Sequence, residues 1–419
     1  MGESTRASDR TQVEATPAGP IGIIGSGTMG AGIAQVIAES GTPVLLFDVE
    51  PAARQRAMGV IRAGLDRRVR RLGLDDSGAR QWVDQALGLV RHDVTIEDMA
   101  LCELVVEAIV EDFEAKRRLF RELGDLAPAT SILASNTSAL SIGALAAETR
   151  HPERVLGLHF FNPVAVMALV EVVAPIGASE VSVERAAGLV RAWGKTPIMC
   201  ADRPGFIVNR VIRPFTLEAL AMVDAGEAEP ASVDASMRAA GFPMGPFELM
   251  DLIGIDVNLA VVQALHRAFV ALGDAGADRF RPSPTQERLV RDGRLGRKTG
   301  EGFYRYPVSG RAAADESPTA SAEIHQRIVL AIIAEAYRAA GDGLAPAGNI
   351  DRALVLGAGH PRGPFAWVES LGGPAVVLAG LRAREKLGPR FVPPSSLLEA
   401  VSARGDVPST DPREPRSAP

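Results

Sequence analysis

The sequence predicts an α/β protein, with a doubly wound parallel sheet in its N-terminal part and two all-helical domains after it. Three observations lead to this prediction. A glycine-rich turn joins an apolar run to a helical pattern near the N-terminus. Further short apolar runs then alternate with helical segments, as in a parallel sheet. The second half of the chain is helical in pattern, and one long segment of it occurs twice.

The bulk composition narrows the class of protein. The chain has 419 residues, of which 47% are hydrophobic and 23% are charged, as in a globular protein of two or three domains. The net charge of −6 argues against a nucleic acid as partner. Two cysteines cannot form a disulfide framework, no apolar run is long enough to cross a bilayer, and the N-terminus lacks the apolar core of a signal peptide. We therefore expect a cytoplasmic protein without a membrane partner.

The glycine-rich turn reads GSGTMG and follows the apolar run at residues 21–24. Gly25 permits a tight turn, Gly27 lets a pyrophosphate approach the backbone, and Gly30 lets the following helix pack closely on the strand. The N-terminus of that helix presents N–H groups to the phosphates. This pattern predicts a Rossmann-type dinucleotide site. Its predicted cofactor residues are Gly25, Gly27, Thr28, Met29 and Gly30.

The next apolar run, PVLLFD, ends at Asp48, which lies 18 residues after Gly30. A carboxylate at this place can accept hydrogen bonds from both ribose hydroxyls and repels a 2′-phosphate, which favours NAD over NADP. FAD uses a similar fingerprint, and this stretch alone leaves it open.

Residues 52–91 are helical in pattern and carry Arg67, Arg68, Arg70 and Arg71 on about one turn. This cluster is either a solvated helix face or a site for a phosphorylated substrate carrier.

Two further strands place polar residues at the ligand edge of the predicted sheet. LCELVVEAIVEDFEAK reads as a strand that runs into a helix, and it brings Glu111 and Lys116 near the cofactor unless they form only a surface contact. SILASNTSAL follows with a strand and a polar turn that contains Ser138.

His159 stands near the end of the predicted strand VLGLHF, and Glu171 lies within the next strand, ALVEVV. A carboxylate is costly to bury without a partner, and a histidine with such a partner can act as a base. The alternative is a histidine that only fills the core. No histidine or cysteine spacing matches a metal site, so no metal is predicted.

Five segments in this order, GIIGSGTMGAGIAQV, LVVEAIVED, ASNTSALSI, GLHFFNPV and RPGFIVNR, resemble the 3-hydroxyacyl-CoA dehydrogenase family, as does GFPMGPFELMDLIG. The resemblance covers about residues 21–306. It implies NAD-dependent oxidation of a (3S)-3-hydroxyacyl-CoA to the 3-oxo thioester, and we expect a short acyl chain such as 3-hydroxybutyryl.

The resemblance also implies roles for individual residues. His159 is expected to be the general base and Glu171 its partner. Ser138 and Asn209 are expected to contact the reacting oxygen, and Asn162 to support the site. Asp48 is expected to hold the adenosine ribose, with Glu111 and Lys116 on the nicotinamide side. Arg67 and Arg71 fit the CoA-binding flap of the family. From its residue type alone, Asn209 could equally be a local cap.

The helical half contains a duplication. Residues 210–254 and 327–372 match, with Asp234 aligned to Asp351 and PMGPF aligned to PRGPF. The second copy has Gln326 in place of Asn209, so we expect that it lost the site and kept the packing. Members of the family with one copy dimerise through this domain, so the second copy is expected to act as an internal partner, in a monomer or in a homodimer.

The expected segments are a disordered tail (1–19), an NAD-binding domain (20–202), a helical domain (203–306), a linker (307–321), a second helical copy (322–403) and a disordered tail (404–419). Three other functions stay open on the residues alone. They are a dehydrogenase of a free or carrier-protein-bound hydroxy acid, a non-catalytic NAD-binding protein, and a flavin enzyme.

Overall fold

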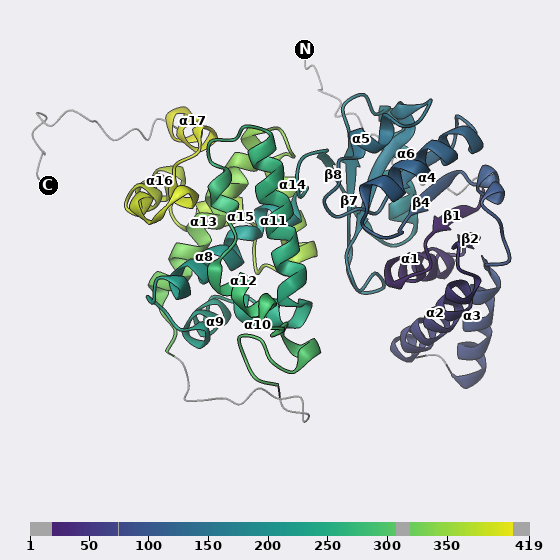
Figure 1. Ribbon diagram of the computed structural model, residues 1–419, viewed down its shortest axis with the longest axis horizontal. Coiled ribbons are helices and arrows are strands. Elements are labelled where there is room, and N and C mark those ends of the chain that lie inside the picture. Colours follow the sequence, from purple (N-terminus) through teal and green to yellow (C-terminus); the bar gives the residue numbers. More distant parts are fainter. Residues whose placement is uncertain (1–18, 74, 307–318, 405–419) are drawn as a thin grey trace, which may run out of the picture. The chain divides into compact units, whose positions relative to one another are not determined.

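The computed structural model describes residues 19–73, 75–306 and 319–404. The chain divides into two compact units, Met1–Asp202 and Arg203–Pro419 (Figure 1). All but one residue of each predicted tail, and most of the predicted linker, lie outside the described residues.

The first unit is built on an eight-stranded sheet with the order β3-β2-β1-β4-β5-β6-β7-β8. Its strands are β1 (Ile21–Ile24), β2 (Val44–Phe47), β3 (Val90–Arg91), β4 (Leu104–Glu107), β5 (Ile132–Ser135), β6 (Val155–Phe160), β7 (Leu169–Ala174) and β8 (Thr196–Ala201). Strands β1 to β6 are parallel, which confirms the doubly wound sheet. Strand β7 runs antiparallel to β6, and β8 runs parallel to β7, so the sheet is not wholly parallel. Only residues 161–168 join β6 to β7, which is too short for a parallel crossover.

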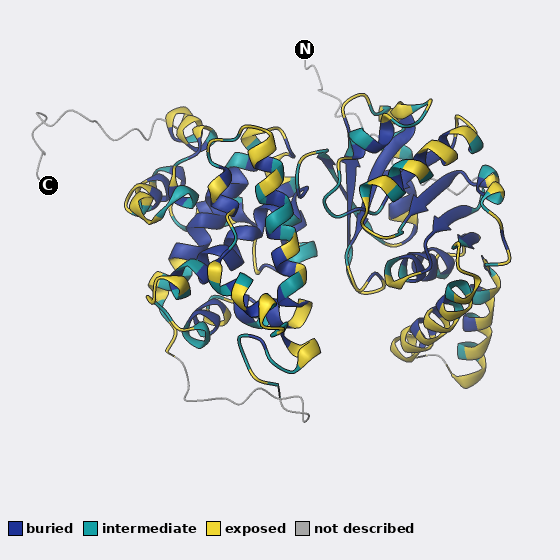
Figure 2. Cartoon of the chain, viewed as in Figure 1, coloured by how far each residue is buried: buried dark blue, intermediate teal, exposed yellow. Residues whose placement is uncertain are grey.

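The helices of this unit are α1 (Thr28–Glu39), α2 (Pro51–Leu72), α3 (Asp76–Gly88), α4 (Phe113–Leu126), α5 (Ile142–Ala146) and α6 (Glu180–Ala192). Each has buried residues beside residues that are at least partly exposed, as Figure 2 shows, and α2 packs mainly on α1 and α3 rather than on the sheet. Residues 52–91 were expected to be helical throughout, and this was wrong at two places. Gly73 ends α2 in the left-handed conformation, with φ of 67°. Strand β3 then follows α3.

The second unit is helical. Its helices are α7 (Val208–Val211), α8 (Arg213–Asp224), α9 (Pro230–Ala239), α10 (Pro246–Ile253), α11 (Ile255–Ala271), α12 (Pro284–Arg291), α13 (Ala322–Gly341), α14 (Ala347–Ala358), α15 (Pro364–Ser370), α16 (Pro374–Arg382) and α17 (Ser395–Ala403). Among the described helices, none is by itself long and apolar enough to cross a bilayer, and two sharply bent helix pairs meet that length and composition only together.

The duplication has a structural counterpart in how an aspartate holds the next helix. Asp234 accepts hydrogen bonds from the N–H groups of Phe247 (2.9 Å) and Glu248 (3.0 Å). In the second copy Asp351 accepts them from Phe365 (2.8 Å) and Ala366 (3.0 Å). Both carboxylates thus satisfy the open N–H groups at a helix start.

The glycine of the repeated Gly-Pro-Phe segment makes this contact possible. A Cβ atom on Gly245 would lie 2.2 Å from Asp234 Oδ1, and one on Gly363 would lie 2.2 Å from Asp351 Cγ. A larger residue at either place would push the aspartate away from the helix. The residues shared by the two copies therefore have one common structural cause.

The two copies face each other with reciprocal ion pairs. Arg210 Nε lies 2.7 Å from Glu335 Oε1, and Arg327 Nε lies 2.6 Å from Glu218 Oε1. The residues are equivalent, because 327 − 210 and 335 − 218 both equal 117. When residue i of one copy contacts residue j of the other and the reverse contact also forms, the interface has the symmetry of a two-fold dimer. The duplicated domain is packed as an internal dimer.

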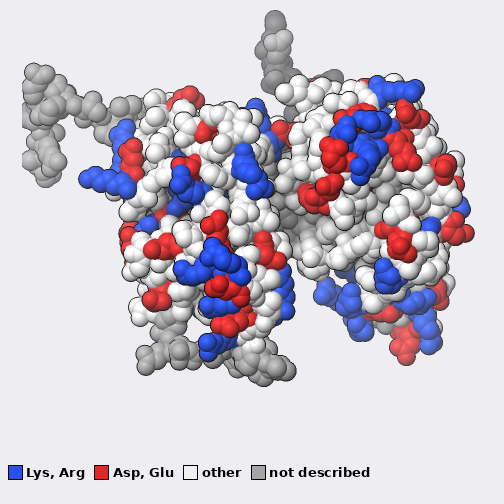
Figure 3. Space-filling view, viewed as in Figure 1, with Lys and Arg blue, Asp and Glu red and all other residues white. Residues whose placement is uncertain are grey.

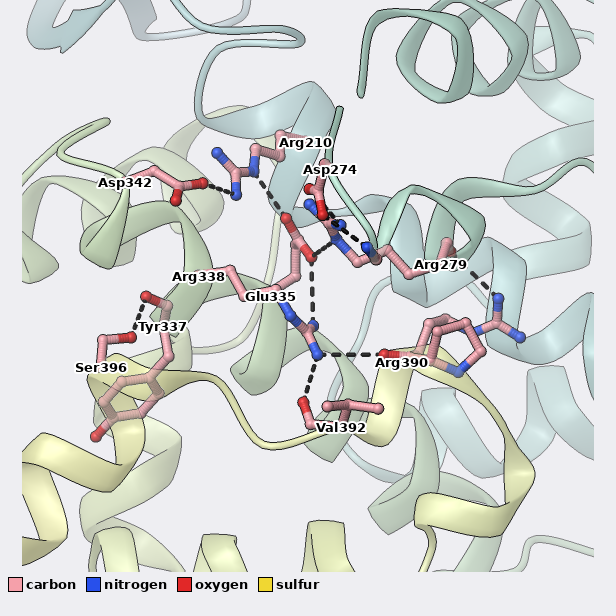
Figure 4. Close-up of polar contacts among 12 residues, drawn as sticks. Arg210, Asp274, Arg279, Glu335, Tyr337, Arg338, Asp342, Arg390, Val392 and Ser396 are labelled. Atoms are coloured by element: carbon pink, nitrogen blue, oxygen red, sulfur yellow. Dashed lines mark hydrogen bonds and ion pairs between the residues drawn. The ribbon is translucent and has the colours of Figure 1, made fainter. Parts of the chain in front are cut away.

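Glu335 is the centre of a larger cluster, drawn in Figure 4. Its Oε2 lies 2.8 Å from Arg279 Nε and 3.5 Å from an Arg338 nitrogen. Arg210 also lies 2.6 Å from Asp342, and Arg279 forms an ion pair with Asp274 of its own copy. Glu218, the equivalent residue of the first copy, also pairs with a second arginine: its Oε2 lies 2.5 Å from Arg390 Nε. Buried arginines are thus held by carboxylates of both copies.

A second symmetric contact lies between the two Pro-x-Gly-Pro segments. The Phe242 and His360 rings, which are equivalent residues of the two copies, are 4.9 Å apart and nearly perpendicular. The His360 side chain is buried, and its Nε2 has no hydrogen-bond partner among the described residues. Burial lowers the pKa of His360 to about 3, so the ring is neutral in the folded protein.

We expect the His360→Phe variant to be more stable than the wild type, because phenylalanine needs no hydrogen bond. The unfolded chain binds a proton at His360 below pH ~6.5 while the folded chain does not. The wild type therefore loses stability through this residue as the pH falls from about 6.5 toward 3, and the variant does not. The gain in Tm should be larger at pH 5 than at pH 8. An equal gain at both pH values would contradict this assignment.

Candidate active site

The glycine-rich turn connects β1 to α1. Gly25 has φ of 100°, and a Cβ atom on it would lie 2.5 Å from the carbonyl oxygen of Ala108. A Cβ atom on Gly30 would lie 1.8 Å from the carbonyl oxygen of Gly25. Gly27, by contrast, has no atom within 4 Å of its Cβ position, so the space in front of it is open. The turn is close-packed on its protein side and open on the other.

A cavity of about 770 Å³ begins at this turn. The first residue of α1, Thr28, lines it together with Gly25 and Gly27, and Met29 follows in the first turn of the helix. The first N–H groups of a helix have no partner within the helix and bind phosphate oxygens well. Farther along, apolar side chains line the cavity, among them Val49, Val60, Ile96, Val110 and Leu119.

Asp48 lies in the same cavity, directly after β2. Its Oδ2 accepts hydrogen bonds from the Ser26 N–H (2.8 Å) and hydroxyl (2.9 Å), and its Oδ1 accepts one from the Glu50 N–H (3.0 Å). Burial raises its pKa, but these hydrogen bonds outweigh that effect and the pKa lies below 3.8. A negative charge at this place fits the ribose of NAD and opposes a 2′-phosphate. These residues fit NAD, as predicted.

A charged cluster lies at the carboxyl end of β4. Lys116 is buried, with its Nζ 2.5 Å from Glu107 Oε1 and 3.3 Å from Glu111 Oε2. Glu107 is fully buried and also accepts a hydrogen bond from the Ser135 hydroxyl (2.6 Å). The sequence reasoning named Glu111 and Lys116 but missed Glu107. A charged residue that ends the buried strand LVVE was the available signal, because such a group needs a partner.

Glu111 also orders the turn after β5. Its Oε1 accepts hydrogen bonds from the Thr137 hydroxyl (2.6 Å) and from the Ser138 N–H (2.9 Å). Ser138 itself is half-buried. The structure therefore joins the predicted residues Glu111, Lys116 and Ser138 through a single carboxylate.

His159 and Glu171 lie directly opposite each other in the antiparallel pair β6 and β7. His159 Nδ1 is 2.6 Å from Glu171 Oε2, and the two residues are 4% and 0% exposed. Opposite residues of antiparallel strands bring their side chains together on one face of the sheet. The local reversal of strand direction is thus what places the carboxylate against the imidazole.

Two residues to which the sequence assigned no individual role fix the surroundings of His159. Asn136, directly after β5, accepts a hydrogen bond from the Phe160 N–H at 2.9 Å. Lys195 donates to the carbonyls of Val164 (2.6 Å) and Met167 (2.8 Å), in the segment between β6 and β7. Such side-chain to backbone bonds cannot be recognised from spacing in the sequence.

The remaining predicted residues belong to other segments of the chain. Asn162 is exposed, two residues after the end of β6. Asn209 belongs to the second unit, in the short helix α7. Arg67 and Arg71 are exposed near the end of α2, where Figure 3 shows basic side chains gathered. The neighbouring Arg68 lies 3.8 Å from Glu39.

Known proteins resemble this chain over most of its length. A family model for the NAD binding domain of 3-hydroxyacyl-CoA dehydrogenase matches residues 20–203. The model for the C-terminal domain of 3-hydroxyacyl-CoA dehydrogenase matches residues 205–306 and 324–413. The second model thus matches both helical copies.

Among curated relatives, 3-hydroxyadipyl-CoA dehydrogenase of Escherichia coli (strain K12) is 44% identical over 303 residues, which are 71% of this chain and 62% of that relative. The chain thus spans less than two thirds of it. A probable 3-hydroxybutyryl-CoA dehydrogenase of Deinococcus radiodurans is 42% identical over 286 residues, 68% of this chain and 99% of the relative. The crystal structure of 3-hydroxybutyryl-CoA dehydrogenase from Escherichia coli K12 has a TM-score of 0.82 and 34% identity, over 93% of this chain and 99% of that one.

Proposed function

This chain belongs to the 3-hydroxyacyl-CoA dehydrogenase family of NAD-dependent oxidoreductases, and on that premise we propose that it interconverts a short-chain (3S)-3-hydroxyacyl-CoA and its 3-oxo thioester. The observation that carries this proposal is the buried His159–Glu171 pair in the sheet that also forms the dinucleotide site. A protein that only binds NAD has no use for such a pair.

In this proposal Glu171 sets the tautomer of the base. Its carboxylate accepts the hydrogen bond of the Nδ1–H group, which leaves the lone pair of the neutral ring on Nε2. In the oxidation, Nε2 takes the proton of the 3-hydroxyl group, and Glu171 stabilises the imidazolium that forms. In the reverse reaction, the same nitrogen returns the proton to the oxygen. When bound, NAD supplies the acceptor for the hydride from C3.

The other predicted residues bind and orient. Ser138, whose backbone Glu111 holds in place, and Asn209 contact the reacting oxygen, and Asn162 supports the segment after β6. The glycine-rich turn holds the pyrophosphate, and Asp48 holds the adenosine ribose. Lys116, fixed by Glu107, keeps Glu111 at the nicotinamide side. No metal takes part in this proposal.

We expect the Asp48→Ala variant to lose most of its preference for NADH over NADPH. The variant loses the ribose hydrogen bonds and also the charge that repels a 2′-phosphate, and a hydrogen bond to a charged group contributes ~1.5–3 kcal/mol. The ratio of kcat/KM for the two cofactors should fall by about 10- to 100-fold. Steady-state kinetics with both cofactors measures it. The exposed Asp75→Ala variant is the control, and an unchanged ratio in Asp48→Ala would refute the ribose assignment.

We expect the double variant Arg67→Glu, Arg71→Glu to raise the KM for a CoA thioester by about 10-fold with little change in kcat. Both guanidinium groups are exposed and can pair with the phosphates of CoA, and the charge reversal turns attraction into repulsion. The control is Arg150→Glu, Arg191→Glu, which changes the net charge equally at ion-paired surface sites. Equal KM values for the two double variants would argue for a merely solvated helix face.

The test of the proposed function is NADH oxidation by the purified protein with acetoacetyl-CoA. Free acetoacetate, acetoacetyl on an acyl carrier protein, and NADPH serve as parallel reactions. We expect oxidation only with the CoA thioester and NADH. Faster turnover of the free acid or the carrier-protein thioester would replace the proposed substrate, and no turnover of any of them would favour the non-catalytic alternative.

A further inference from the structure

Arg213, the first residue of α8, is a buried cation without a carboxylate partner. In the described part of the second unit four arginines are buried, namely Arg210, Arg213, Arg279 and Arg327. The other three each form ion pairs with two carboxylates. For Arg213 no carboxylate lies within ion-pair distance among the described residues, and it is only 6% exposed.

The guanidinium of Arg213 is satisfied at one side only. Its Nε donates to the backbone carbonyl of Asn209 at 2.9 Å, which turns the side chain back toward α7. One terminal nitrogen, NH1, is buried and has no hydrogen-bond partner among the described residues. Burial, with no opposing charge, lowers the pKa of Arg213 to about 10, so the group still keeps its charge at neutral pH.

The fold does not need an arginine at this place. With the repeat offset of 117, residue 213 corresponds to Leu330 of the second copy. Leu330 is 2% exposed and packs against Gly380, where an added Cβ atom would lie 2.9 Å from a leucine methyl carbon. A buried cation without a counter-ion is destabilising, and an apolar residue avoids that cost. The copy that keeps Asn209 carries the arginine, and the copy that lost it carries leucine.

We propose that Arg213 binds a carboxylate at the far end of the acyl chain, so that the preferred substrates are 3-hydroxyacyl-CoA thioesters of dicarboxylic acids. This inference rests on the proposed function, in which Asn209 contacts the oxygen on C3. Because Arg213 Nε donates to the Asn209 carbonyl at 2.9 Å, the guanidinium lies beside Asn209, and a few carbon atoms beyond C3 can span the distance between the two side chains. The planar guanidinium matches a carboxylate in geometry and charge.

The test compares two thioesters of equal carbon number, 3-oxoadipyl-CoA and 3-oxohexanoyl-CoA, by NADH oxidation. Wild-type protein should prefer the dicarboxylic chain in kcat/KM by about 10- to 100-fold, as expected for a charged hydrogen bond. The Arg213→Leu variant, which carries the residue of the second copy, should lose most of this preference. The exposed Arg288→Leu variant should keep it, which separates a specific contact from general attraction of an anion.

Every outcome of this comparison either supports or overturns the inference about Arg213. If wild type shows no preference, or if Arg213→Leu lowers both activities and leaves their ratio unchanged, Arg213 only holds the Asn209 carbonyl and the inference is overturned. If Arg213→Leu does not fold, Arg213→Lys, which keeps the charge but not the planar fork, should show an intermediate ratio; an unchanged ratio in that variant overturns the inference. If neither thioester is reduced while acetoacetyl-CoA is, the inference is overturned and the proposed function stands. If acetoacetyl-CoA is not reduced either, the proposed function itself has failed.

Discussion

Replacement of His159 with alanine should lower kcat by about 100- to 10,000-fold with acetoacetyl-CoA and NADH. A positioned general acid or base contributes this factor, which corresponds to about 3–5 kcal/mol of activation free energy. His159 is 2.6 Å from the carboxylate that orients it, and both groups are buried, so water cannot easily replace the imidazole. Steady-state kinetics measures the loss.

The NADH affinity of this variant, followed by the fluorescence of the bound nicotinamide, should stay within about 3-fold of wild type, a difference of about 0.7 kcal/mol. The control is His151→Ala, because His151 also pairs with a glutamate, Glu153, but at the surface. Near-wild-type turnover in His159→Ala would show that His159 is not the general base.

Glu335→Gln should cost the second unit about 3–5 kcal/mol of unfolding free energy, the usual effect of breaking a buried ion pair. The glutamate is 0% exposed and faces three arginines, of which Arg338 has no other carboxylate within ion-pair distance among the described residues. The amide of glutamine carries no charge, so the three arginines would lose the negative charge that Glu335 places between them. Calorimetry should show a lower Tm for the transition of the helical unit, while the first unit keeps its own.

The pH dependence gives a second readout for the same residue. Burial raises the pKa of Glu335, but the three arginine charges outweigh it and hold the pKa below 4.5. Because the folded state binds this proton less readily than the unfolded state, the stabilisation is present above pH ~4.5 and is lost as the pH falls below it. The deficit of Glu335→Gln should therefore shrink in acid. Glu369→Gln, at an exposed pair with Arg404, should change the stability little, because solvent screens such a pair, and an equal cost in both variants would contradict the central role of Glu335.

The sequence predicted those parts of the site that depend on local order. Each glycine of the turn has a steric reason that the pattern already contains, and Asp48 follows directly from the end of β2. His159 and Glu171 could be paired in advance, because each needed a partner in an apolar strand. The antiparallel direction of β7, which makes their contact possible, depends on the short connection before it and was not predicted.

The contacts that could not be predicted join segments that are distant in the sequence. Lys195 holds the carbonyls of the segment after His159 from a turn near β8, and nothing in its surroundings marks it. The reciprocal ion pairs of Arg210 and Arg327 could be predicted in part. Both arginines stand at the same place in the repeat, but their pairing with the opposite copy follows only when the two-fold arrangement is known.

The most direct measurement of the central claim is NADH formation from NAD with (3S)-3-hydroxybutyryl-CoA, compared with the (3R) isomer, in wild type and in His159→Ala. The account predicts NADH from the (3S) thioester with wild-type protein, and a rate at least about 100-fold lower with the variant. NADH formation from neither isomer, or equal rates for the two proteins, would contradict it.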